Sequence, residues 1–149
     1  MGAAMTDRNE VEALLRAAYA ARQRGDVEAI LGVFAENAHF GLAGSRQASP
    51  VAMRGTGLEA LRAQMTGLVQ AFEWLDQDIL SMIVEGSRAA VHWRGRIRSA
   101  VTGDEVETEV VDIASVENGK IVSFVEFCDT ALAARLMEAP ERPREPLVG

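Results

Sequence analysis

The feature of this sequence that most constrains its fold is a change of hydrophobic period near Trp74. Before this residue, apolar side chains recur at the three- and four-residue spacing of helices. After it, stretches rich in β-branched residues are separated by "EGS", "TGD" and "ENG" at 85–87, 102–104 and 117–119. Short segments of this kind are typical of hairpin turns. Helices followed by an antiparallel meander predict an α+β fold in which helices cover one face of a curved sheet.

Capping residues divide the first half of the chain into three expected helices. Asp7 and Asp26 stand where they can cap the first two, and Gly25 stands where the first should end. Thr56 and Glu59 have the spacing of a capping box for the third helix.

The apolar stripes of the second and third helices are expected to reach Phe34 and Phe72, and a short strand or sheet edge is expected at 39–42. A short helix is expected from Asp129 to Leu136.

One domain is expected, because a chain of 149 residues can bury about two thirds of its unfolded surface without a metal or a disulfide. We expect it to span residues 7–137, between a flexible N-terminus at 1–6 and a proline-rich tail at 138–149.

Charge and motif content exclude several classes of function. The net charge of −7 repels phosphate backbones, and no cluster of Lys and Arg overrides it, so no nucleic-acid partner is expected. The sequence contains no apolar run of about 18 residues, so no membrane span is expected. A Gly-rich phosphate loop, a metal-ligand spacing and a nucleophile elbow are all lacking, which predicts no cofactor and no metal. One cysteine, Cys128, and no apolar leader favour a cytoplasmic location.

A carboxylate stands in the most strand-like segment, "GKIVSFVEFCD" at 119–129, where Glu126 lies between Val125 and Phe127. Glutamate is rarely buried without a partner, and desolvation of an unpaired carboxylate is costly. Glu126 therefore faces either water or a site that uses a desolvated carboxylate.

Charge pairing suggests a register for the hairpin around 102–103. Arg98 opposite Glu107 and Arg96 opposite Glu109 form two opposite-charge pairs across the strands. These side chains are expected on the outer face of the sheet.

The same register sets Trp93 opposite Asp112 on the other face. A three-residue loop at 117–119 would then set Val110 opposite Glu126, so that Asp112 and Glu126 share a face. A two-residue Asn-Gly turn would shift the register by one and separate the two carboxylates. We prefer the first register because it leaves a continuous apolar surface beneath the helices.

Two carboxylates in one apolar pocket resist simultaneous ionisation, so one pKa rises toward neutrality, which suits general acid/base catalysis. We therefore take Glu126 as candidate base or acid, Asp112 as its partner and Tyr19 as candidate hydrogen-bond donor. The structural alternative is that a carboxylate turns outward, or accepts a hydrogen bond from Trp93, Tyr19 or the backbone.

Three segments, "YAARQRGDVEAILGVFAENAHF", "RGTGLEALRAQM" and "NGKIVSFVEFCDTA", carry a resemblance that covers nearly all of residues 7–137. In this order and spacing they resemble the SnoaL-like domains of the nuclear-transport-factor-2-like superfamily, which includes ketosteroid isomerase and limonene epoxide hydrolase. The resemblance implies a cone: a strongly bent antiparallel sheet with three N-terminal helices that close a pocket, usually in a homodimer.

Most functional residues of those relatives lack a counterpart here. The general base of the isomerase would fall on Leu42, and its oxyanion-binding tyrosine near Ala18, one residue from Tyr19. Its oxyanion-binding aspartate falls on Asp112 if one residue is gapped. The acid/base aspartate of the SnoaL cyclase and one catalytic aspartate of the epoxide hydrolase both fall on Glu126.

Two functions follow as hypotheses. The first is a cofactor-independent acid/base enzyme, of isomerase, cyclase or hydrolase type, that acts on a small, largely apolar molecule. The second is a non-catalytic, dimeric module of the same fold that binds a small ligand. The expected ligand-binding wall consists of Phe40, Leu42, Leu61, Trp93 and Phe124.

A homodimer is expected through the convex face of the sheet, because this face is too apolar to remain in water. The residues that make it apolar are Val111, Ile113, Val125 and Phe127.

Overall fold

The computed structural model describes residues 7–137, so both expected terminal segments, 1–6 and 138–149, lie outside the described residues. The helices are α1 (Arg8–Arg24), α2 (Val27–Gly32), α3 (Leu58–Ala71) and α4 (Thr130–Leu136). The strands are β1 (Phe34–Leu42), β2 (Met53–Thr56), β3 (Phe72–Glu85), β4 (Arg88–Ser99), β5 (Glu105–Glu117) and β6 (Lys120–Phe127).

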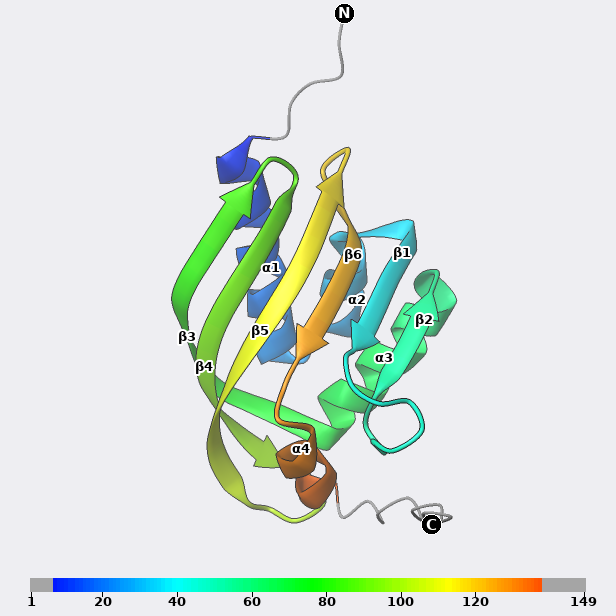
Figure 1. Cartoon of the computed structure of the whole chain (residues 1–149), viewed down its shortest axis with the longest axis vertical. Coiled ribbons are helices and arrows are strands. Elements are labelled where there is room, and N and C mark those ends of the chain that lie inside the picture. Colours follow the sequence, from blue (N-terminus) through cyan, green and yellow to red (C-terminus); the bar gives the residue numbers. More distant parts are fainter. Residues whose placement is uncertain (1–6, 138–149) are drawn as a thin grey trace, which may run out of the picture.

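The six strands form one sheet in the order β2-β1-β6-β5-β4-β3. Figure 1 shows the strongly curved sheet, with α1 and α2 behind its strands and α4 at the end to which β6 runs. The predicted α+β architecture is confirmed. One ladder differs from the antiparallel expectation, because β1 pairs with β6 in parallel. The intervening helix and meander supply the long crossover connection that a parallel pair requires.

The first two helices begin where the sequence predicts, and the first also ends there. The Asp7 side chain accepts from the backbone N–H of Asn9, and the Asp26 side chain accepts from that of Ala29. Gly25 ends α1 in the left-handed region, with a φ of 69°.

The predicted capping box of the third helix is wrong. Thr56 is the last residue of β2, where it pairs with His39, and its hydroxyl lies 3.2 Å from Nδ1 of that residue. Because Thr56 pairs with and contacts His39, its side chain does not cap the helix. The cap position of α3 is Gly57, which has no side-chain cap bond.

Phe34 and Phe72 begin strands instead of completing helical stripes. Phe34 pairs with Ile121 on β6, and Phe72 pairs with Ser99 on β4. The strand expected at 39–42 is accordingly longer, and β1 lies inside the sheet with β2 at the edge.

The hairpin of β4 and β5 is displaced by two residues from the expected register. Arg98 lies opposite Glu105 and Arg96 lies opposite Glu107. The connection is wider than expected because the buried Ser99 hydroxyl accepts from backbone N–H groups of the turn and also donates to a carbonyl of α4. Since the displacement is even, the predicted faces are preserved.

The hairpin of β5 and β6 combines two irregularities. Asn118 and Gly119 form a two-residue turn with φ angles of 49° and 72°, as in the alternative that separates the carboxylates. A bulge then follows, because Val116 pairs with Ile121 whereas Ser115 pairs with Ser123, which leaves Val122 unpaired in this ladder.

The bulge returns Asp112 and Glu126 to the same face. The two residues lie directly opposite each other in the ladder. The expected pair of Val110 with Glu126 is therefore wrong by two residues, although the expected convergence of the carboxylates is correct.

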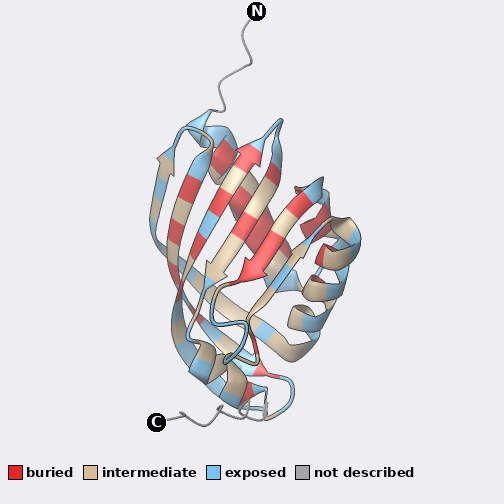
Figure 2. Cartoon of the chain, turned by 45° about the vertical axis from the view of Figure 1, so that its right-hand side comes forward, coloured by how far each residue is buried: buried red, intermediate tan, exposed pale blue. Residues whose placement is uncertain are grey.

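The core lies between the helices and the concave face of the sheet. Figure 2 shows buried residues alternating along the central strands, as expected for strands that present one face to the helices. Trp93, Leu15 and Leu61 are among the largest fully buried side chains. Within residues 7–137, no helix is long and apolar enough to cross a membrane.

Candidate active site

Asp112 is the most deeply buried carboxylate of the described chain, with 1% of its surface exposed. Its Oδ2 accepts a hydrogen bond from the Tyr19 hydroxyl at 2.7 Å and another from Trp93 Nε1 at 2.8 Å. These donors come from α1 and β4, on opposite sides of the core. Oδ1 is buried and has no hydrogen-bond partner among the described residues.

The surroundings of Asp112 favour its neutral form. Burial raises the pKa of Asp112 well above its ordinary value, and the Glu126 charge adds to this rise. The hydrogen bonds from Tyr19 and Trp93 act in the opposite direction, because they stabilise the carboxylate. A neutral Asp112 carries its proton on Oδ1, since Oδ2 already accepts two hydrogen bonds.

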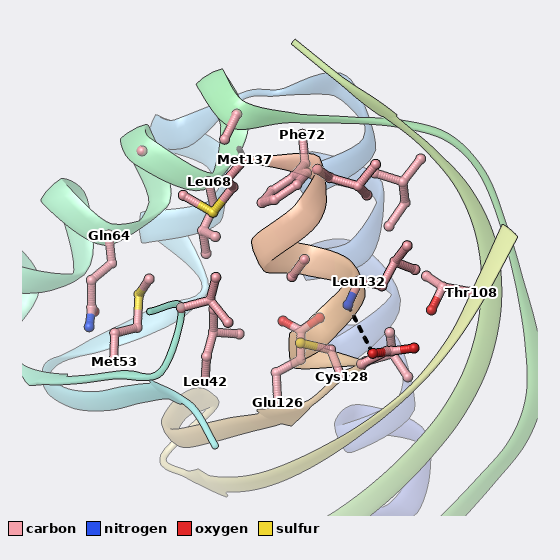
Figure 3. A pocket seen from close by; sticks show the side chains of 18 of the residues that line it. Leu42, Met53, Gln64, Leu68, Phe72, Thr108, Glu126, Cys128, Leu132 and Met137 are labelled. Carbon is pink, nitrogen blue, oxygen red and sulfur yellow. Dashed lines mark hydrogen bonds between the residues drawn. The ribbon is translucent and has the colours of Figure 1, made fainter. Parts of the chain in front are cut away.

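Glu126 lies across from Asp112 on β6 and is half-buried. Figure 3 shows its side chain extending from the strand into a cavity, near Cys128. Among residues 7–137, no group donates a hydrogen bond to this carboxylate. Burial raises the pKa of Glu126 to about 7, against the opposing effect of the Arg22 charge. The side chain can therefore hold or release a proton near neutral pH.

The cavity that Glu126 enters has a volume of about 550 Å³ and is mostly apolar. Its walls come from α1, α3 and α4 and from the concave side of the sheet. Apolar residues of this wall include Leu42, Met53, Leu68, Phe72, Leu132 and Met137.

A second, smaller cavity of about 40 Å³ shares Arg22 and Glu126 with the first. Tyr19 and Asp112 also line it. This volume is sufficient for about one water molecule, and the four side chains supply the polar partners that a buried water requires.

Of the five residues expected to bind ligand, three line one of the two cavities and two do not. Leu42 lines the main cavity, whereas Phe40 and Phe124 line the small one and stack on each other with ring centroids 5.9 Å apart. Leu61 and Trp93 line neither cavity and are fully buried in the core. Trp93 instead holds Asp112 through its indole N–H.

Arg22 on α1 is a cavity residue that sequence reasoning missed. Its Nη2 donates to the carbonyl oxygens of Leu68 and Phe72, at 3.1 and 2.9 Å, and its guanidinium lies 4.7 Å from the Trp74 ring centroid. Burial lowers the pKa of Arg22 to about 10. Arg22 follows the buried Ala18 by four residues, and this helical spacing is the signal that could have revealed it.

Other titratable residues are less suited to chemistry. Burial and nearby carboxylates raise the pKa of Cys128 to about 12, so its thiol stays protonated at neutral pH. His92 contacts Glu109 at 2.9 Å on the outer face, and His39 contacts Thr56, so neither enters the main cavity. Within the described part of the chain, no group of His, Cys, Asp and Glu side chains could hold a metal ion.

Tyr19 is expected to resist ionisation for as long as the protein is folded. Burial and the nearby Asp112 raise the pKa of the phenol above its ordinary value of 10.0. Because Tyr19 is the only tyrosine, tyrosinate absorbance in an alkaline titration reports on this side chain alone. Tyrosinate should form together with the loss of far-ultraviolet dichroism, and a Tyr19→Phe variant gives the blank. Ionisation near pH 10 in the folded protein would contradict the buried contact.

The profile of one sequence family matches most of the chain. The SnoaL-like domain matches residues 15–124, a range that includes Asp112 and ends two residues before Glu126. No curated protein matches the chain in sequence.

Solved structures share the fold at low sequence identity. A proposed isomerase of Bacillus subtilis has a TM-score of 0.80 at 14% identity and covers 91% of this chain and 98% of its own. A proposed polyketide cyclase of Xanthomonas campestris has a TM-score of 0.71 at 18% identity, with coverages of 89% and 99%. An LEH-like epoxide hydrolase of M. tuberculosis has a TM-score of 0.68 at 12% identity, with coverages of 87% and 90%. At these identities the likeness shows the fold alone.

Proposed function

Because the chain belongs to the SnoaL-like domain family, we propose that it is a cofactor-independent acid/base enzyme, of isomerase, cyclase or hydrolase type, for a small and largely apolar molecule. The observation that carries the proposal is the Glu126 carboxylate. It enters an apolar cavity with no hydrogen bond from the described residues, and its pKa is raised to about 7. A carboxylate in these surroundings suits proton transfer better than fold stability.

In this proposal Glu126 takes a proton from the substrate, or from a water molecule beside it, and later returns it. Asp112 stays neutral and limits the build-up of negative charge, because two adjacent buried carboxyl groups do not ionise together easily. Tyr19 and Trp93 act as positioning residues, since both donate to Asp112 and not to the substrate. The apolar wall excludes water from the reacting groups.

The size and lining of the main cavity support a small organic substrate. Its volume of about 550 Å³ lies within the usual range of small-molecule sites, which is about 300–1,000 Å³. The isomerase, cyclase and hydrolase assignments of the structural relatives supply the reaction classes by fold-level analogy.

A non-catalytic binding module of the same fold is the second candidate. Leu42 favours the binding module. It lines the cavity at the position where the related isomerase is expected to hold its general base, and an aliphatic side chain cannot act as a base. The module would use the same cavity to retain an apolar ligand without turnover.

Isotope incorporation separates the two candidates without knowledge of the natural substrate. A panel of apolar ketones in D₂O reports proton abstraction from carbon, and a panel of apolar epoxides in ¹⁸O-labelled water reports hydrolysis. The enzyme proposal expects incorporation that is lost in Glu126→Gln and retained in Glu109→Gln, a matched change outside the cavity. Binding of panel members with identical background incorporation in all three proteins would establish the binding module.

We also propose that the protein is a homodimer that pairs through the outer face of β5 and β6. Phe127 and Ile113 are 49% and 37% exposed on this face. Their cross-strand neighbours are Val111 and Val125, so the four side chains form one apolar patch. Association of two copies would remove this patch from water.

Light scattering at micromolar concentration should give a mass near twice the 16.1 kDa of one chain. Phe127→Lys should shift the protein toward the monomer, because a lysine there must be desolvated in the interface. Ile83→Lys on β3 is the matched control, since Ile83 is exposed but lies outside the patch. A monomeric parent protein, or equal effects of both variants, would refute this interface.

A further inference from the structure

Four polar side chains with donors line the main cavity, namely Arg22, Arg54, Gln64 and Thr108. Of these four, only Arg22 also lines the small cavity with Asp112 and Glu126. The Tyr19 hydroxyl and the Trp93 indole N–H both donate to Asp112 Oδ2, so neither is free for a molecule in the cavity. Glu126, when ionised, can only accept. A proton transfer beside Glu126 needs a donor that can bind the oxygen on which negative charge collects.

Arg22 lies where such a donor is needed, and its position is fixed. One guanidinium nitrogen, Nη2, donates to the carbonyl oxygens of Leu68 and Phe72, which end α3. A cation at the C-terminal end of a helix is favourable because unpaired carbonyls and the helix dipole converge there. The Trp74 ring lies against the guanidinium and restricts it further.

These contacts leave most of the guanidinium donors unused. The group has five N–H bonds, of which Nη2 supplies two. In the described range, Nε and Nη1 donate to no acceptor, and no carboxylate lies within ion-pair distance of Arg22. Arg22 lines both cavities, as Glu126 does. The free donors and the base therefore border the same space.

We propose that Arg22 binds an acceptor oxygen of the ligand and thereby selects apolar carbonyl compounds for the main cavity. A neutral carbonyl is favoured over a carboxylate, because an ionised Glu126 in the same cavity repels a second negative charge. A hydrocarbon of the same shape would leave the Arg22 donors without a partner. Whether a molecule binds then depends on its acceptor oxygen as well as on its apolar shape.

The proposal also assigns Arg22 a part in the reaction, and this part rests on the proposed function. When Glu126 takes a proton from the carbon next to the carbonyl, the electrons of the C–H bond form a C=C bond. The π electrons of the C=O bond then move to the oxygen, which becomes negative opposite the guanidinium. Where the substrate carries a C=C bond next to that carbon, the negative charge also extends to the far end of this bond. Return of the proton from Glu126 to that end restores the C=O bond and completes an isomerisation without an oxidant or a co-reactant.

The other arginine of the cavity wall provides a matched control. Arg54 is exposed, and its side chain lies over Gly41 and contacts His39. It carries the same charge at the edge of the cavity without the two carbonyl contacts that fix Arg22.

The test uses acetophenone and isopropylbenzene, which have nearly the same shape and differ in the carbonyl oxygen. Calorimetric titration of the full chain should show that acetophenone binds about tenfold or more tightly than isopropylbenzene, as expected for a hydrogen bond to a charged donor. In Arg22→Gln the two affinities should approach each other, whereas Arg54→Gln should keep the parent ratio. Equal loss of both affinities in Arg22→Gln would assign Arg22 a structural role only and overturn the proposal.

Infrared spectroscopy on the unaltered protein provides a second test, which does not depend on the folding of any variant. The carbonyl stretch of bound acetophenone should lie at lower wavenumber than in an apolar solvent, because the guanidinium polarises the bond. An unshifted band, or failure of acetophenone to bind, would overturn the proposal. Both measurements record binding without turnover, so their failure is distinct from the loss of isotope incorporation that tests Glu126.

Discussion

Replacement of Glu126 by Gln is expected to abolish turnover and to raise the melting temperature above pH 7. The loss of the proton-transferring group should reduce turnover by about 10²–10⁴-fold. The gain in stability follows from burial of a carboxylate that has no hydrogen-bond donor within residues 7–137. Glutamine has nearly the same shape and no charge to desolvate.

The stability gain should depend on pH in a defined direction. The pKa of Glu126 is about 7 in the folded protein, against an ordinary value of 4.5. Between these values the folded state binds more protons than the unfolded state, so stability falls as pH rises. The full cost is reached above pH 7 and amounts to about 3 kcal/mol. Below pH 4.5 the parent and the Glu126→Gln variant should have similar stability, because the glutamate is neutral in both states.

Thermal unfolding monitored by circular dichroism at several pH values checks this expectation. Glu109→Gln, on the outer face beside His92, should not reproduce the pH-dependent gain. Glu126→Leu should behave like Glu126→Gln in stability. If both Glu126 variants melt well below the parent, the residue belongs to the scaffold, since breaking a satisfied buried pair costs about 3–5 kcal/mol.

Replacement of Asp112 by Val is expected to have the opposite effect on stability. Valine removes the acceptor shared by Tyr19 and Trp93, whose buried donors are then left unpaired. Each unsatisfied donor costs about 1–3 kcal/mol, so the free energy of unfolding should fall by about 2–5 kcal/mol. Asp112→Asn should lose much less, because its amide oxygen can accept both hydrogen bonds.

Urea unfolding of the two variants measures this difference. Tyr19→Phe provides an independent check, since removal of the phenol oxygen should cost about 1–2 kcal/mol in the parent. The same change should cost little or nothing in the Asp112→Val background, where the hydroxyl has already lost its acceptor. Asp112→Val with the stability of the parent would show that neither hydrogen bond contributes to the fold.

The convergence of Asp112 and Glu126 was expected from the alternation of side chains along a strand, but it arises by another route, because the turn has two residues and the bulge at Val122 supplies the third residue of the expected loop. Both hairpin registers were wrong by two residues, and an error of two leaves every side chain on its face. The registers themselves could not be predicted. The wide connection after β4 depends on Ser99, whose hydroxyl bonds to a carbonyl of α4 far along the chain.

The composition of the cavity wall was less predictable, because it depends on how helices pack on the sheet. Leu61 and Trp93 lie on faces that could have met either the cavity or the core, and they meet the core. Arg22 continues a buried helical stripe, but only the end of α3 supplies the carbonyls that hold its charge there. Thr56 does not cap α3 for a similar reason, since it pairs with His39 where β2 meets β1, and this pairing is a tertiary contact.

The unpaired Val122 determines which residue of β6 lies opposite Asp112 and therefore which side chain enters the site. If Val122 were paired and the bulge closed without a change of chain length, Val125 would take the place of Glu126 opposite Asp112, and the glutamate would face outward. Loss of Val122 itself would leave a regular hairpin with Glu126 still opposite Asp112, whereas loss of a single residue between this bulge and Glu126 would turn the glutamate outward. The loop at 43–52, between β1 and β2, lies outside this hairpin, and its length can vary by single residues without reversing the faces of β5 and β6.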